Sequence, residues 1–121
     1  MTNSASQFAS QLRQFTGSEN WYRHGIIPEV LYTDGAKFVA EEGGAYWLLD
    51  IIAISQHEPS VKAEEFQVWK LLVNMDRSAT VYCEDGNNNV VFSQSIPYTD
   101  FPLFNLMLYF TNQVIHLPSE Y

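Results

Sequence analysis

The apolar residues of this 121-residue chain change their spacing near position 66. Before that point they recur every three or four residues, as in "ASQFASQLRQF", and "AYWLLDIIAIS" is almost wholly apolar. After it, "FQVWKLLV", "ATVYCE" and "VVFSQSI" alternate or are rich in β-branched and aromatic residues. A period near 3.6 indicates helices, and a period of two indicates strands. The order of the two patterns predicts an α+β domain in which N-terminal helices pack on a C-terminal sheet.

The helical part is predicted to cover about residues 4–57. Its first helix, over residues 4–15, has Ser4 or Ser6 as its cap and Gly17 as its stop. One narrow apolar stripe follows this helix and consists of Phe8, Leu12 and Phe15. A loop or short extended segment is expected next, over residues 18–31.

Two further helices flank a pair of glycines. Thr33 or Asp34 is the expected N-cap of the second helix, and Gly43-Gly44 ends it. The third helix, over about residues 45–56, is the most apolar stretch and is therefore predicted to be the central buried helix. Pro59 lies just beyond its end, where a stop is expected.

Residues 66–118 predict an antiparallel meander of four or five strands. Asp-Gly in "DGNNN", between two β-rich runs, is a hairpin signal. "LFNLMLYF" and "VIHL" predict a second hairpin around Thr111-Asn112-Gln113, with Pro118 ending the last strand. Because Leu and Met favour helices, a helix over 103–110 followed by a strand is the alternative. The length suits one domain, so we expect residues 1–121 to form a single globular unit.

The net charge of −8 comes from six basic and fourteen acidic residues. Such a charge repels phosphates and anionic lipids, so we expect no direct nucleic-acid partner and no membrane binding. Eight of the acids lie within residues 29–65, where they either meet a basic partner or only confer solubility. Mimicry of nucleic acid is a third idea, but it needs carboxylates at phosphate-like spacing, and these occur as scattered pairs.

The sequence predicts a cytoplasmic protein. No apolar run approaches the roughly 18 residues of a membrane span, and the first residues lack the pattern of a signal peptide. The single cysteine, Cys83, excludes an internal disulfide and fits a reducing compartment.

The common catalytic and cofactor motifs are missing from this sequence. It contains no phosphate-binding glycine loop and no Gly-x-Ser-x-Gly elbow, and its three histidines lack metal-ligand spacing. "DGNNN" resembles the start of a calcium loop, but Val90 replaces the required glycine. Cys83 lies beside Glu84 within a β-rich run, which favours a buried structural thiol. We therefore expect no cofactor and no metal.

Asp50 is the one charged residue inside an otherwise apolar helix. Tyr46, Asp50 and His57 fall on one face of that helix. Asp50 then lies on a solvent edge, forms a structural ion pair, or acts as a partly buried acid that orients His57 or pairs with Arg23. Since a carboxylate that holds an imidazole builds a general base, the catalytic candidates are His24, Asp50, His57 and Arg23.

The stretch "ENWYRHGII" places two aromatic residues beside a cation and an imidazole. If the aromatics anchor the loop onto the sheet, the stretch is a polar-edged corner of the core. If they are exposed, Trp, Tyr and Arg are the residue types of an interface hot spot. "PYTDFP" raises the same question and predicts a rigid corner. The candidate binding residues are Trp21, Tyr22, Arg23, His24, Asp34 and Asp100.

Several stretches resemble an uncharacterised family of small bacterial proteins from cyanobacterial, plasmid and phage-related genomes. They are "FTGSENWYRH", "YTDGAKFVAEEGGAYWLLDIIAISQ", "FQVWKL", "IPYTDFPL" and "LPSEY". The resemblance covers nearly the whole chain and implies a bacterial, single-domain, cytoplasmic protein. It implies no activity and no functional residue.

Two functions are compatible with these observations. The first is a non-enzymatic protein-interaction module that binds another protein or itself, for example as a homodimer. It predicts a self-association interface or an apolar patch of several hundred square ångströms. The alternative is a small hydrolase-like enzyme that uses His24 or His57 with Asp50 and Arg23. It predicts a cleft in which these side chains converge.

Overall fold

The computed structural model describes residues 5–121, so the possible cap Ser4 lies outside the described residues. The helices are α1 (Ala5–Leu12), α2 (Asp34–Glu42), α3 (Tyr46–Ile54) and α4 (Pro59–Lys62), with 3-10 turns η1 (Ser55–His57) and η2 (Pro118–Glu120). The strands are β1 (Trp21–Arg23), β2 (Leu31–Thr33), β3 (Gln67–Val73), β4 (Ala79–Glu84), β5 (Val90–Ile96), β6 (Asn105–Thr111) and β7 (Val114–His116). The α+β class is as predicted.

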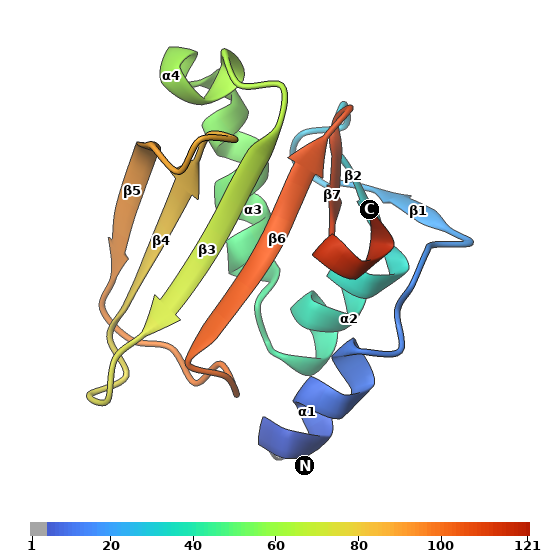
Figure 1. Cartoon of the computed structure of the whole chain (residues 1–121), viewed down its shortest axis with the longest axis vertical. Coiled ribbons are helices and arrows are strands. Elements are labelled where there is room, and N and C mark those ends of the chain that lie inside the picture. Colours follow the sequence, from blue (N-terminus) through green and yellow to red (C-terminus); the bar gives the residue numbers. More distant parts are fainter. Residues whose placement is uncertain (1–4) are drawn as a thin grey trace.

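The sheet has seven strands in the order β1-β2-β7-β6-β3-β4-β5 (Figure 1). Its pairs are antiparallel except for β2 and β7, which run parallel. Residues 66–118 form five antiparallel strands, but the prediction was wrong in two respects: the sheet is larger, and it is no meander because β6 pairs with β3. The missed strands, β1 and β2, have three residues each, which is too short to show alternation.

The helices are also not all N-terminal. Pro59, expected only as a stop, occupies the first turn of α4. Pro118, expected to end the last strand, opens η2. Both positions suit proline, because the first turn of a helix leaves its backbone N–H groups without intrahelical partners.

α3 is the central buried helix, as predicted. In Figure 1 it crosses behind β3 and β6, and it buries Leu48, Leu49, Ile52 and Ala53. The facing side of β3 presents Gln67, Trp69, Leu71 and Val73, which are all buried. Each fully buried leucine or isoleucine side chain stabilises the fold by about 1.5–3 kcal/mol relative to an exposed one.

A reciprocal pair of side-chain amides connects η1, which follows α3, to β3. The side-chain N–H of Gln67 donates to Gln56 Oε1 at 2.9 Å, and Gln56 donates back to Gln67 Oε1 at 2.8 Å. Gln67 also donates to the carbonyl of Val61 and accepts from the indole N–H of Trp69. A polar side chain only 1% exposed is thereby fully hydrogen-bonded, as burial requires.

Both predicted hairpins are present. Asn112 and Gln113, between β6 and β7, have φ values of 51° and 65°, as the two central residues of a type I′ turn require. In β6 the buried Leu106, Leu108 and Phe110 alternate with more exposed neighbours, so the strand interpretation was right and the helix alternative wrong. In the β4–β5 turn, the Asp85 carboxylate accepts from the backbone amides of Asn87 and Asn89.

The N-terminus of α2 is held by three separate segments. Thr33, one of the two predicted caps, accepts from the Ala36 amide at 3.2 Å. The Ser18 hydroxyl accepts from the Asp34 amide at 2.9 Å, and the Glu120 carboxylate accepts from the Gly35 amide at 3.0 Å. Three first-turn amides that a helix leaves unpaired are thus satisfied.

Glu120 connects η2 to this helix end. Its Oε1 also accepts from the Thr33 hydroxyl at 2.7 Å and from the Leu117 amide at 2.9 Å. The approach is close: a Cβ atom on Gly35 would lie 2.5 Å from Glu120 Oε1 and 2.6 Å from Leu117 Cδ1. Glycine is therefore needed at position 35 for the carboxylate to reach the helix.

Replacing Glu120 tests this connection. Glu120→Ala leaves the Gly35 amide and the Thr33 hydroxyl without their acceptor, so we expect the free energy of unfolding to fall by about 1–3 kcal/mol. The neighbouring, exposed Ser119→Ala serves as the control and should change it by less than about 0.5 kcal/mol. Urea denaturation gives both values, and equal stability of the two variants would contradict this role of Glu120.

Candidate functional site

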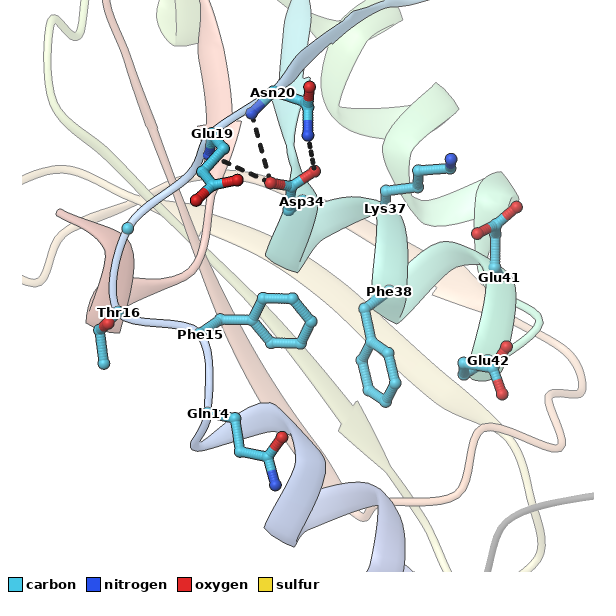
Figure 2. Close-up of a pocket in the computed structure, with 11 residues that line it drawn as sticks. Gln14, Phe15, Thr16, Glu19, Asn20, Asp34, Lys37, Phe38, Glu41 and Glu42 are labelled. Atoms are coloured by element: carbon cyan, nitrogen blue, oxygen red, sulfur yellow. Dashed lines mark hydrogen bonds between the residues drawn. The ribbon is translucent and has the colours of Figure 1, made fainter.

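A hollow with a volume of about 510 Å³ lies between the α1–β1 loop and α2 (Figure 2). Phe15, from the loop, and Phe38, from α2, form its apolar part, with ring centroids 5.3 Å apart. Its acidic lining consists of Glu19, Asp34, Glu41 and Glu42. Among the described residues that line it, Lys37 is the only basic one. We call this feature the acidic hollow.

Asp34 connects the two walls of the acidic hollow. Its carboxylate accepts from the Tyr22 hydroxyl at 2.9 Å and from the backbone amides of Glu19 and Asn20 at 3.1 and 3.3 Å (Figure 2 shows the bonds from Glu19 and Asn20). The Tyr22 hydroxyl, followed by these amides, lowers the pKa of Asp34 below its usual value, although desolvation opposes the shift. Asp34 is therefore ionised at neutral pH. The same hydrogen bond raises the pKa of Tyr22.

The positive charge of Lys37 lies beside the Tyr22 ring and not beside the two phenylalanine rings of the acidic hollow. Its ammonium lies 4.4 Å from the centroid of the Tyr22 ring, which is a cation–π distance. Figure 2 shows its side chain pointing away from the two phenylalanine rings. The acidic hollow thus keeps an excess of negative charge.

His24 and Asp50 form the second pair of predicted site residues that meet. His24 Nε2 lies 2.8 Å from Asp50 Oδ1, and Nδ1 accepts from the amides of Ile26 and Ile27 at 3.1 and 3.0 Å. Because two N–H groups point at Nδ1, the ring proton is on Nε2, which donates to the carboxylate. The imidazole is only 5% exposed, whereas the side chain of Asp50 is 44% exposed. Both ring nitrogens are therefore occupied by structural contacts.

The other predicted residues do not join either pair. Arg23 is exposed, and its guanidinium donates to the Pro28 carbonyl at 2.6 Å, so it does not pair with Asp50. His57 is exposed in η1, and Asp50 binds His24 in its place. The regular helix ends at Ile54, and His57, seven residues after Asp50, lies about two turns further along the chain.

Trp21 and Asp100 are both on the surface. The Trp21 side chain is 55% exposed on the edge strand β1, and Asp100 is exposed in the 97–104 connection. Around Asp100, Arg77 donates to the carbonyls of Thr99 and Phe101 at 3.0 and 2.6 Å. The corner predicted from "PYTDFP" is thus held from the β3–β4 turn.

The acidic hollow as a whole was missed by the sequence analysis. Asp34, Phe38 and Glu41 have spacings of four and three on α2, which places them on one helix face. That spacing is the feature of the sequence that could have indicated one wall of the acidic hollow. The position of Phe15 opposite this face depends on the tertiary packing of α1, which no local pattern reveals.

A family model described as "Family of unknown function (DUF6876)" matches residues 6–121. The chain belongs to this family. No curated protein and no solved structure gives a significant match. The predicted resemblance to a family of unknown function is thus confirmed, while the cyanobacterial, plasmid or phage origin stays a prediction.

Neither a metal cluster nor a membrane helix is found among residues 5–121. No three His, Cys, Asp or Glu side chains in this range are grouped so that they could hold a metal ion. No helix in the same range is long and apolar enough to cross a membrane.

Cys83 is a buried structural thiol, as predicted. Its side chain is fully buried in β4. Burial, followed by the nearby carboxylates of Glu64, Glu84 and Asp85, raises the pKa of the thiol to about 12. The thiolate, which is the reactive form, is therefore scarce at neutral pH.

Asp50 substitutions test the role of the pair with His24. Asp50→Ala removes the acceptor of the buried Nε2–H, and we expect the free energy of unfolding to fall by about 1–2 kcal/mol. Asp50→Asn keeps an acceptor oxygen and should lose less. The exposed Asp100→Ala is the control, and all three are compared by urea denaturation. Equal stability of Asp50→Ala and the control would refute a structural role for the pair.

Thiol labelling tests the environment of Cys83. The folded protein should react with an aromatic disulfide reagent at least about a hundredfold more slowly than the protein unfolded in urea, because the thiol is buried and protonated. The absorbance of the released thiolate follows both reactions. Rapid, stoichiometric labelling of the folded protein would show that Cys83 is accessible.

Proposed function

We propose that this protein is a non-enzymatic protein-interaction module and that the acidic hollow binds a basic segment of a partner protein. The observation that carries the proposal is the combination of two phenylalanine rings with four carboxylates in one hollow. A small bacterial protein of the cytoplasm, as the sequence predicts, would meet such segments in other soluble proteins.

The chemistry of the acidic hollow suits lysine and arginine side chains. Their aliphatic stems pack on apolar surface while the charged end stays among polar groups. Here Phe15 and Phe38 offer the apolar surface, and Glu19, Glu41 and Glu42 offer charges near the opening. Asp34 contributes a fixed charge, because its hydrogen bonds favour the ionised form.

The charge of the whole chain supports the same partner. A net charge of −8 attracts basic segments over distances of about one Debye length and repels acidic ones. Complementary charge increases the association rate and helps to exclude wrong partners.

The hydrolase-like alternative has less support from the geometry. A histidine that acts as a general base needs a nitrogen lone pair that can take a proton from the substrate or from water. In His24 the lone pair on Nδ1 accepts from two amides, and the proton on Nε2 is donated to Asp50. Arg23 and His57 lie outside this pair.

A labelled peptide of about twelve residues, rich in Lys and Arg, tests the proposal. We expect the peptide to bind the parent protein, with an affinity at least about tenfold lower at 300 mM than at 50 mM salt. We expect its affinity for the double variant Glu41→Gln/Glu42→Gln to be about tenfold lower than for the parent protein. Fluorescence anisotropy measures all three dissociation constants. A matched acidic peptide should not bind.

The control variant is Glu29→Gln/Glu58→Gln. It removes the same charge from two exposed positions that do not line the acidic hollow. Its affinity should change by less than about threefold, because only the long-range attraction is reduced. If both double variants weaken binding equally, the peptide responds to net charge alone and the acidic hollow is not the site.

A further inference from the structure

One face of the sheet carries no helix among the described residues. α3 crosses behind β3 and β6 in Figure 1, and the near face of β3, β4, β5 and β6 is open. Since neighbouring residues of a strand point to opposite faces, the side chains between the buried positions form this surface. We call it the open face.

The open face is unusually poor in charge for this chain. Its outward positions on β3, β4 and β6 are Val68, Lys70, Leu72, Thr80, Tyr82, Glu84, Asn105, Met107 and Tyr109. The paired positions on β5 are Val90, Ser93 and Ser95. Lys70 and Glu84 are the only charged residues in this set, and their Nζ and Oε1 atoms lie 3.0 Å apart.

Apolar and aromatic side chains surround this ion pair. Leu72 is 42% exposed and Met107 is 37% exposed, and Val68, Tyr82 and Tyr109 are partly buried. Toward β7 the surface continues as a cluster of aromatic rings with centroids 4.9–5.8 Å apart. These rings belong to Phe66, Tyr109, His116 and Tyr121.

The distribution of charge selects the occupant of the open face. Lys70 and Glu84 cancel, so the whole net charge of −8 lies on the rest of the molecule. Two copies of this chain therefore repel each other least when they meet through a neutral surface such as this one. A basic partner, in contrast, gains nothing from a neutral surface.

We propose that the open face binds the open face of a second copy of this chain. In a two-fold symmetric contact the same patch meets itself, so each residue must suit its own counterpart. An axis near Leu72 and Met107, which are exposed, brings them against apolar side chains of the other copy, while the Lys70–Glu84 pair stays within each copy. The proposal is separate from the acidic hollow, which lies on the helical side of the sheet.

The size of the open face indicates how strong this dimer is. Four strands at a spacing of about 4.8 Å, each with six residues at about 3.3 Å, cover roughly 400 Å² of projected area per copy. The aromatic cluster adds to this. Two copies together then bury about 800 Å² of strand surface, which is less than the roughly 1,200–2,000 Å² of stable interfaces, so we expect a weak, reversible dimer.

Sedimentation velocity between about 5 and 500 µM is the test. We expect the weight-average mass to rise from one copy toward two, and the dimer to become stronger from 50 to 300 mM salt, because salt screens the repulsion between the acidic surfaces. This salt effect is opposite to that expected for peptide binding at the acidic hollow. A protein that stays monomeric at 500 µM in both buffers overturns the proposal.

Two matched variants locate the interface. Leu72→Glu places a charge in the centre of the open face and should weaken the dimer at least about tenfold. Ile54→Glu adds the same charge to a side chain of similar exposure, 48%, on α3 and should leave the dimer within about threefold of the parent. If the two variants weaken the dimer equally, or neither does, the open face is not the interface.

Folding and the other site are checked with the same proteins. Circular dichroism establishes that each variant is folded, and Met107→Lys, of opposite charge, gives a second test of the open face should Leu72→Glu not fold. The Leu72→Glu variant should still bind the basic peptide with unchanged affinity. A protein that does not dimerise but binds the peptide contradicts only the dimer proposal. A protein that dimerises but does not bind the peptide contradicts only the proposed function.

Discussion

The capped N-terminus of α2 is the interaction on which the remaining architecture depends. Three backbone amides there donate hydrogen bonds to the side chains of residues 18, 33 and 120, which belong to three different segments. The Ser18 contact holds the α1–β1 loop beside α2, and it is this loop that closes the acidic hollow. The Glu120 contact holds η2 beside β2, next to the parallel pairing of β2 with β7. The hydrogen bonds of one helix end thus hold both the loop that lines the acidic hollow and the C-terminal turn η2.

The parts of the fold that were predicted correctly are those with a long periodic signal. α3 and the strands β3 to β6 each have six to nine residues, so their apolar spacing is readable. β1 and β2 have three residues each and pair through backbone groups that the sequence does not specify. The parallel pairing of β2 with β7 joins Leu31 to Val114, a separation no local pattern can reveal.

The same limit applies to the candidate site. Tyr22, His24, Asp34 and Asp50 were among the candidate site residues, and the structure brings them together as two pairs. The pairing of Asp34 with Tyr22 was not predicted, and the partner of Asp50 was left open, because these contacts span 12 and 26 residues. Arg23, His24 and His57 were all possible partners of Asp50, and His24 is the one that is buried against it. Composition indicated an acidic protein but did not show that one sheet face is neutral.

The bond between Glu120 and the start of α2 has a consequence for the order of folding. The Thr33 hydroxyl and the Glu120 carboxylate are separated by 87 residues, so closing this contact requires a long loop to be ordered first. During synthesis the first turn of α2 emerges from the ribosome long before Glu120, which accepts one of its hydrogen bonds, has been added to the chain. The helix and the N-terminal edge of the sheet therefore become fully hydrogen-bonded only when residue 120 has been released from the exit tunnel. We expect this edge of the molecule to form late, after the local hairpins of β3 to β6.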